Sequence, residues 1–419
     1  MPRLTPIEIL RLSEPVELVY QQTVDALLVN IAKHFNAGKE LSTQDWQLKK
    51  LAEMGQLNRE TLQIISSMTG QVPELIQAAL ENAALKAIKD MDPDVKERAE
   101  EGILTGESPR TAIASQSIRQ SMESYASQAV DKFNLVNTTM LQSTLEQYRK
   151  VIVNTANIER QMQAAQGILN EAAGKVVTGA FSRTQALRDA LSKLSDEGIT
   201  GFYDKAGRKW SPEAYTNMDV RTTVHNTALE ARKTAALESG RHIFQVTRHN
   251  GARPLCYPYQ GKFYSWKNES GTFVDGEGKR HSYAPISSTS YGKPAGLFGV
   301  NCGHDWDLIE EGVYIPRERT KQDKEENDRV YKESQEQRRL EREVRYAKRK
   351  AVLLNKAGDK EGFEAAAAKI KQRQDAYNSF CKETGRTKRN DRTQVYEYNR
   401  SISSKVTQVN RKIQKQKGQ

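Results

Sequence analysis

Two cysteines and several histidines are the side chains of this sequence best suited to specific chemistry. Cys302 and His304 are two positions apart, so on an extended backbone their side chains point to the same side. With Cys256 and either His249 or His281 they form a Cys2His2 set, the kind that holds Zn²⁺ in tetrahedral geometry. The spacing matches no standard zinc finger. The alternative is that no cofactor is bound, the cysteines are small buried hydrophobes and the histidines form hydrogen bonds.

Two enzymatic interpretations use the same part of the sequence. An HNH-type nuclease needs a histidine base at a ββα metal site, and His249 is followed by an asparagine, but no matching downstream Asn and His fall on a helix. An ADP-ribosyltransferase-like set would combine Arg221, the Ser-Thr-Ser run at 288–290, Glu341 and Glu343. The glutamates lie in a charged helical pattern, where residues two apart do not share a face. Neither enzyme is favoured.

The glycines and aromatic residues around the cysteines have simpler expected roles. Four glycines are expected to supply positive φ or close backbone approach: Gly251, Gly261, Gly296 and Gly299. Arg253 is expected to donate to backbone carbonyls or to a carboxylate such as Asp305. Four aromatic residues are expected to form a small core rather than a base-stacking platform: Tyr264, Trp266, Tyr283 and Trp306.

The positive charge is concentrated at the C-terminal end. The net charge is +11, yet residues 317–419 hold 29 Lys and Arg against 16 Asp and Glu. A basic segment on a neutral body favours nucleic acid, because each neutralised phosphate releases counterions. A solvated helix with a basic tail is the alternative. The candidate phosphate contacts are Arg338, Arg339, Arg342, Arg345, Lys348, Arg349, Lys350, Arg386, Lys388, Arg389, Arg411 and Lys412.

Length and composition set the broad class. Only 37% of the 419 residues are hydrophobic, which favours a helix-rich molecule with a small core for its length. No window approaches the roughly 18 apolar residues of a membrane helix, and the start lacks the apolar core of a secretory signal. Three cysteines cannot pair completely. We therefore expect assembly in a reducing cytoplasm and no membrane partner.

We expect a mainly α protein with a short central sheet. The predicted parts are a helical N-terminal assembly region at 1–210, a compact α+β domain at 211–316, a charged helical arm at 317–385, and a basic, flexible tail at 386–419. The first region has apolar residues at three- and four-residue spacing, as amphipathic helices do.

Local signals place several elements. Ser211 followed by Pro212 predicts a helix start, and Gly240 predicts its end. Residues 242–248 predict a strand because β-branched and apolar residues alternate there. Residues 201–210 predict a hairpin.

Five sequence blocks occur in a fixed order: RTTVHN, HNGARPLCYPYQGKFYS, STSYG, GLFGVNCGH and QRRLEREVRYAKRK. Together they resemble the minor capsid, or head morphogenesis, proteins of tailed phages, more narrowly the phage minor capsid protein 2 and Mu F-like family. The residues that carry the resemblance are His249, Gly251, Arg253, Pro254, Gln260, Gly261, Asn301, Cys302 and His304. One departure is Gly303, where the family usually has arginine.

The resemblance implies a structural, non-enzymatic virion protein. It implies a few copies inside the head near the portal vertex, assembled in the host bacterial cytoplasm. Such a protein would aid head assembly and DNA packaging or ejection. The implied partners are the portal and major capsid proteins, the packaged double-stranded DNA, and further copies of the same chain.

Overall fold

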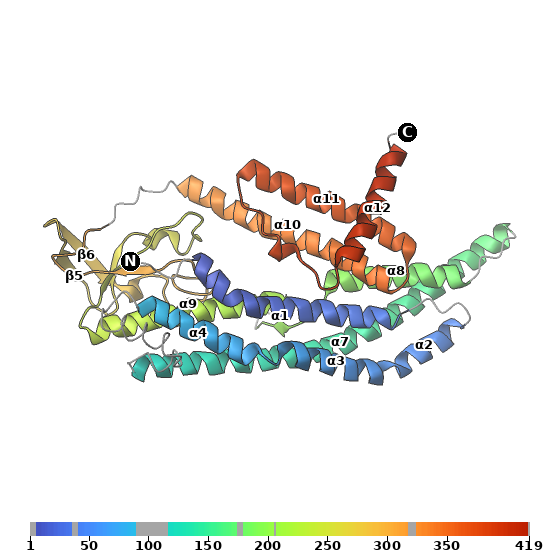
Figure 1. The fold of residues 1–419 in the computed structure, drawn as a ribbon, viewed down its shortest axis with the longest axis horizontal. Coiled ribbons are helices and arrows are strands. Elements are labelled where there is room, and N and C mark those ends of the chain that lie inside the picture. The colour runs from blue at the N-terminus through green and yellow to red at the C-terminus, as the bar shows by residue number, and fades with distance from the viewer. Residues whose placement is uncertain are drawn as a thin grey trace. The chain divides into compact units, whose positions relative to one another are not determined.

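A computed structural model describes residues 6–35, 41–88, 116–173, 179–204, 207–316 and 324–417. The helices are α1 (Pro6–Lys33), α2 (Thr43–Ala52), α3 (Met54–Thr69), α4 (Val72–Ile88), α7 (Gln116–Ala173), α8 (Gly179–Glu197), α9 (Pro212–Glu238), α10 (Lys324–Lys356), α11 (Lys360–Thr384) and α12 (Arg400–Lys417). The strands are β1 (Phe202–Tyr203), β2 (Lys209–Trp210), β3 (Ile243–Val246), β4 (Phe263–Ser265), β5 (Gly271–Val274), β6 (Arg280–Pro285) and β7 (Trp306–Leu308). The predicted mainly α class with a short central sheet is confirmed (Figure 1).

The chain forms two compact units, each assembled from three separate stretches. Unit 1 contains Met1–Glu17, Gln71–Phe133 and Thr216–Gln335, and unit 2 contains Leu18–Gly70, Asn134–Tyr215 and Glu336–Gln419. This division differs from the expected boundaries at 210, 316 and 385. The reason is that α1, α7, α9 and α10 each supply residues to both units.

A five-stranded sheet organises unit 1. Its strand order is β5-β6-β4-β3-β7. The β4–β6 pair is parallel and the other pairs are antiparallel. The alternating pattern predicted strand β3. This strand pairs with β4 along one edge and with β7 along the other, so it is an inner strand of the sheet.

The two faces of the sheet have separate cores, because side chains alternate along a strand. Phe244 and Val246 of β3 face α9, where they pack with Trp306 and other apolar residues. Ile243 faces the opposite side and packs with Phe273 and Ile309. The expected aromatic core is confirmed, since Tyr264 and Trp306 are buried in the first cluster and Trp266 and Tyr283 pack at the edges of the two.

Helix α9 begins and ends where the local signals predicted. The Ser211 hydroxyl accepts a hydrogen bond from the Ala214 amide at 3.3 Å, as an N-cap does. Gly240 adopts φ +77°, and the following amide, Arg241, bonds back to the carbonyl of Ala236 at 2.9 Å. This arrangement satisfies carbonyls that the helix end leaves without intrahelical partners.

Unit 2 is mainly helical and has an aromatic centre. Trp46, Tyr20, Tyr148 and Phe35 are almost completely buried. The Phe35 and Tyr148 rings lie 4.9 Å apart. Strands β1 and β2 form the predicted hairpin, with Gly207 at φ +74° in its turn.

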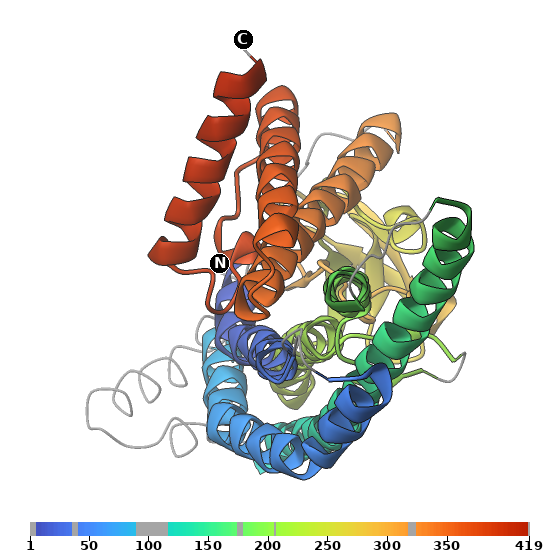
Figure 2. The ribbon, with the colours of Figure 1, turned by 90° about the vertical axis from the view of Figure 1, so that its right-hand side faces the viewer.

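Helices α10, α11 and α12 carry the basic C-terminal segment. In unit 2, α10 and α11 pack through Leu340, Val344, Tyr377 and Cys381. Within the tail that was expected to be flexible, residues 400–417 form α12, which packs against α11 (Figure 2). Ile402 and Val406 of α12 are buried, because these two positions, four apart, fall on one helix face. Across the described residues, no helix is long and apolar enough to cross a membrane.

Candidate functional site

The four predicted Cys/His residues come from two segments that the sheet brings together. Strands β3 and β7 pair through Val246 and Trp306, and the Thr247 amide extends this pairing by donating to the Asp305 carbonyl at 2.8 Å. The segment that leaves β3 therefore runs beside the segment that enters β7. The first carries His249 and Cys256, and the second carries Cys302 and His304.

Three of these residues form a compact buried cluster. The sulfur atoms of Cys256 and Cys302 lie 3.9 Å apart, and the Cys302 sulfur lies 3.3 Å from Nδ1 of His304. Potential ligand atoms of all three lie within 4.8 Å of one another. The ring of His249 lies beside that of His304, with centroids 4.3 Å apart. The alternative ligand His281 is used elsewhere, since its Nε2 lies 2.6 Å from the carboxylate of Asp275.

The close contacts shift the pKa values of the Cys302 and Cys256 thiols in opposite directions. Hydrogen bonding to Cys256, and then to His304, lowers the pKa of Cys302 well below its usual value. The contact with Cys302, followed by burial, raises the pKa of Cys256. Burial lowers the pKa of His249. The shifts favour the thiolate at Cys302 and the neutral imidazole at His249, the forms in which these groups ligate metals.

Three positioning residues support this cluster and were missed by sequence reasoning. His225 of α9 is buried and hydrogen-bonds to the backbone of His304. Arg232 of α9 donates to Asp305 at 2.6 Å and to the Trp306 carbonyl at 2.8 Å. Asn327 of α10 forms two hydrogen bonds with Ala252, in the turn after β3. Its side-chain oxygen accepts from the Ala252 amide at 2.8 Å, and its side-chain nitrogen donates to the Ala252 carbonyl at 2.9 Å. His225 lies in the RTTVHN block that contributes to the family resemblance, whereas Arg232 and Asn327 lie outside the five blocks. All three are distant in sequence from the cluster, so spacing offers no signal for their contacts.

The residues that carry the family resemblance mostly shape the turns around the cluster. Gly251 and Gly261 have φ of +77° and +72°, values that favour glycine. The Gln260 side chain accepts from the His249 amide at 2.7 Å. Asn301 is exposed with φ +52°, and Pro254 is also exposed.

Arg253 contacts a backbone carbonyl, as expected, and not Asp305. Its Nη2 lies 3.4 Å from the oxygen of Gly296, whereas Asp305 pairs with Arg232. Gly296 has no room for a side chain, since an added Cβ would lie 1.9 Å from the Ser290 carbonyl oxygen. The expected close backbone approach is confirmed there and at Gly299.

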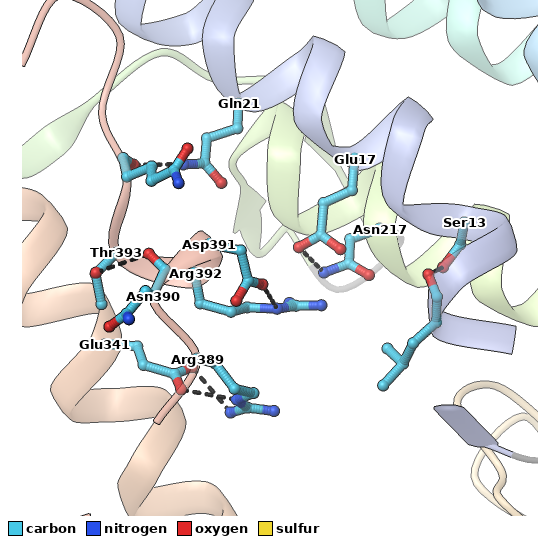
Figure 3. A network of polar contacts seen from close by, with 12 residues as sticks. Ser13, Glu17, Gln21, Asn217, Glu341, Arg389, Asn390, Asp391, Arg392 and Thr393 are labelled. Carbon is cyan, nitrogen blue, oxygen red and sulfur yellow. Dashed lines mark hydrogen bonds and ion pairs between the residues drawn. The ribbon is translucent and has the colours of Figure 1, made fainter. Parts of the chain in front are cut away.

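The predicted phosphate contacts divide into internal and exposed residues. Arg349 is buried and ion-paired with Asp25 at 2.7 Å, so it leaves the proposed phosphate-contacting set. Arg389 is partly exposed, but its charge is already paired, because it donates to both carboxylate oxygens of Glu341 at 2.8 and 2.9 Å (Figure 3).

Several further candidates have internal partners and are partly exposed. Arg345 and Lys348 donate to backbone carbonyls at 3.3 and 2.8 Å, and Arg386 donates to Gln337 at 2.7 Å. Arg339 pairs with glutamates one turn away on either side, and Lys350 is half-buried. The solvent-exposed candidates are Arg338, Arg339, Arg342, Lys388, Arg411 and Lys412.

Comparison with known proteins identifies the family. The model of the family Phage minor capsid protein 2 matches residues 4–382. The chain belongs to this family. The minor capsid match confirms the predicted resemblance and covers both segments of the Cys/His cluster. It ends before α12, so the most basic helix lies outside it.

A curated relative agrees with the minor capsid assignment. The chain is 25% identical over 351 residues to a protein named "Structural protein" from Lactococcus phage LL-H. The aligned region covers 82% of this chain and 87% of the relative. No solved structure matches the chain. A structural protein of a phage is thus the function class that the comparisons support.

The residues of the ADP-ribosyltransferase-like set have structural partners in this minor capsid family member. Ser290 is buried, donates to the Leu255 carbonyl at 2.7 Å and accepts from the Leu297 amide at 2.9 Å. Ile286–Ser288 form a 3₁₀ turn. Arg221 lies 4.0 Å from Glu17. Ser290 and Arg221 therefore both have contacts within the folded chain.

Proposed function

We propose that this phage minor capsid protein is a non-enzymatic component of the head interior near the portal vertex. Its helical surfaces contact the portal and major capsid proteins and further copies of the chain, and its C-terminal basic segment contacts packaged double-stranded DNA. The protein supports head assembly and the packaging or ejection of that DNA. The observation that carries the DNA contact is the charge and exposure of α12.

Helix α12 has one face for packing and one for a polyanion. It contains six Lys and Arg and no acidic residue. Ile402 and Val406 are buried, and Asn410 donates to the Ala367 carbonyl of α11 at 3.1 Å. Lys405, Arg411, Lys412 and Lys415 are exposed. The helix is therefore held by its apolar face while its cations remain available to phosphates.

The rest of the basic segment contributes less to this surface. Lys388 and Arg342 are exposed, but the exposed arginines of α10 alternate with glutamates, as in the pairs of Arg339 with Glu336 and Glu343. Neighbouring carboxylates weaken the field that a phosphate would feel. The strongest contact is thus expected at α12.

A salt titration tests the assignment to α12. The test variant changes Arg411, Lys412 and Lys415 to Gln. The control variant makes the same charge change at three exposed lysines elsewhere: Lys49, Lys267 and Lys279. Binding of both proteins to a short DNA duplex is measured by fluorescence anisotropy across a range of NaCl concentrations.

The two variants should separate clearly. Each lost phosphate contact reduces the slope of log Kobs against log salt by about 0.9, so the α12 variant should lose about 2.7 from the slope. The control variant should keep the wild-type slope, because its three lysines lie outside the basic segment. Equal slopes for wild type and the α12 variant would remove DNA contact from the proposed function.

The location is tested on virions. Lysine cross-linking followed by mass spectrometry should join this chain to the portal protein and to the inner surface of the major capsid protein. The same experiment after DNA release should show whether the chain stays in the head. Cross-links only to tail proteins, with none to portal or shell, would show that the proposed location is wrong.

A further inference from the structure

The Cys/His cluster contains buried polar atoms that no neighbour satisfies. Nε2 of His249 and Nε2 of His304 are both buried, and neither has a hydrogen-bond partner within the described part of the chain. A buried imidazole nitrogen without a partner carries a desolvation cost. Cys256 and Cys302, which are also buried, stand beside these rings. A metal ion bound by Nε2 of His249 and by the two sulfurs would remove the cost at His249.

The distances within the cluster match the edges of a tetrahedral zinc site. With Zn–S bonds of about 2.3 Å and Zn–N bonds of about 2.0 to 2.1 Å, tetrahedral angles place two sulfurs about 3.8 Å apart and sulfur and nitrogen about 3.6 Å apart. The sulfurs of Cys256 and Cys302 are 3.9 Å apart, and Cys302 and His304 Nδ1 are 3.3 Å apart. The ligand atoms of Cys256, Cys302 and His304, which all lie within 4.8 Å of one another, are thus already spaced for one ion.

We propose that Cys256, Cys302 and His304, with His249 as the fourth ligand, hold a structural zinc ion. Thiolate and imidazole together suit Zn²⁺ better than Mg²⁺ or Ca²⁺, which prefer oxygen ligands. Four protein ligands leave no open coordination position, so the site is structural rather than catalytic.

The surroundings of His249 fit the role of fourth ligand. Its Nδ1 lies 3.1 Å from the Asn250 carbonyl oxygen. Donation from Nδ1 to that carbonyl leaves the Nε2 lone pair for a metal, as in most metal-binding histidines. Gly303 faces the same ring, since an added Cβ would lie 3.2 Å from Nε2 of His249. Glycine at this position therefore leaves space around the nitrogen.

The zinc ion would join two distant parts of unit 1. His249 and Cys256 follow β3, whereas Cys302 and His304 precede β7. The intervening chain includes strands β4, β5 and β6. Because the four ligands come together only in the folded chain, the binding free energy of the ion would stabilise the folded state and the irregular turns around the site.

Metal analysis of the full-length protein tests the proposal directly. The protein is purified under reducing conditions, supplied with Zn²⁺, dialysed, and analysed by inductively coupled plasma mass spectrometry. Cys302→Ser and Cys256→Ser are compared with Cys381→Ser, the matched control. Cys381 is the third cysteine of the sequence and is also buried, but it lies on α11, outside the cluster. Circular dichroism verifies that each variant is folded.

One zinc per chain is expected in the wild type and in Cys381→Ser, and loss of stoichiometric zinc is expected in the other two variants. Replacement by Co²⁺ should give the sulfur-to-cobalt charge-transfer bands and the intense visible absorption of a tetrahedral site. His249→Ala should bind zinc more weakly in a chelator competition. Unchanged affinity in that variant would overturn the four-ligand assignment.

A second measurement on the wild type avoids dependence on variants that fail to fold. Chelation should lower Tm, and Zn²⁺ but not Mg²⁺ should restore it, because a ligand that binds only the folded state stabilises that state. A folded wild type without zinc after reconstitution overturns the proposal. So does a single free thiol in the denatured, unreduced protein, which would show a disulfide between Cys256 and Cys302.

Discussion

Replacement of Arg349 by methionine should lower the free energy of unfolding of unit 2 without changing DNA binding. Sequence alone groups Arg349 with the candidate phosphate contacts, but its side chain is only 4% exposed and that of Asp25 is 1% exposed. Nε and Nη2 of Arg349 both lie 2.7 Å from one oxygen of Asp25. The other oxygen accepts from the Tyr396 amide at 3.0 Å. The guanidinium of Arg349 is therefore paired with Asp25 inside unit 2 and is not available to a phosphate.

The magnitude follows from what the methionine leaves behind. The Asp25 carboxylate would stay buried with one backbone hydrogen bond and no cation, and breaking a buried ion pair in this way costs about 3–5 kcal/mol. Glu213, whose carboxylate lies 3.7 Å from Arg349, would also lose its nearby positive charge. Asp25→Leu alone should also be destabilising, because it leaves the buried guanidinium with only the Glu213 carboxylate, 3.7 Å away, as a negative partner.

The assay is urea unfolding at pH 7, followed by tryptophan fluorescence and by hydrogen exchange of peptides from α1 and α10. The double variant Asp25→Leu with Arg349→Met should be more stable than the sum of the single effects predicts, by about 2 kcal/mol. Arg342→Met is the matched control, since Arg342 is exposed on the same helix. A surface change of this kind should alter stability by less than about 0.5 kcal/mol.

Two results would refute this reasoning. Arg349→Met could unfold at the same urea concentration as the Arg342→Met control, which would show that the pair contributes nothing. Alternatively, Arg349→Met could reduce the salt slope of DNA binding as the α12 variant does, which would return Arg349 to the phosphate-contacting set.

Three further substitutions test other parts of the structure. Gly296→Ala should cost about 1–3 kcal/mol in urea unfolding, because its Cβ would collide with the Ser290 carbonyl; stability equal to wild type would contradict that packing. Asp359→Ala should cost about 2–4 kcal/mol, since it removes both the N-cap of α11 and a charged hydrogen-bond partner; no change in Tm would count against the cap. Burial raises the pKa of Asp219 despite its pairing with Lys132, so ionisation at neutral pH opposes folding. Asp219→Asn should therefore be more stable than wild type at pH 7, with the difference vanishing as the pH falls below the ordinary aspartate pKa; a difference that grew in acid would reverse the sign.

Elements with local signals were predictable. The start and end of α9 depend on a serine cap, a proline and a glycine within a few residues of the helix ends, so sequence suffices for them. The hairpin around Gly207 is local in the same sense. The order β5-β6-β4-β3-β7 was not predictable, because the parallel β4–β6 pairing depends on contacts between segments separated by a whole strand.

Helix α12 was missed because its sequence is dominated by charge. Its apolar side is small, and Ile402 and Val406 are its buried members. Such a weak stripe forms a stable helix only when α11 supplies a surface to cover it, since most helical stability in proteins comes from packing rather than from propensity. From the sequence alone, the tail is therefore predicted to be flexible, because the packing surface that α11 supplies is not visible there.

By itself the sequence determined the family, the excess of positive charge beyond residue 317, and which side chains could ligate a metal. These properties depend on residue types and their order, which folding does not change. Only the tertiary structure decided that His249 and not His281 joins the cluster with His304, because pairing of β3 with β7 is a contact between distant segments. Only the tertiary structure also showed that Arg349 is buried whereas Arg342 is exposed. The two are identical in chemistry, and burial beside a carboxylate is a property of the packed chain rather than of the residue.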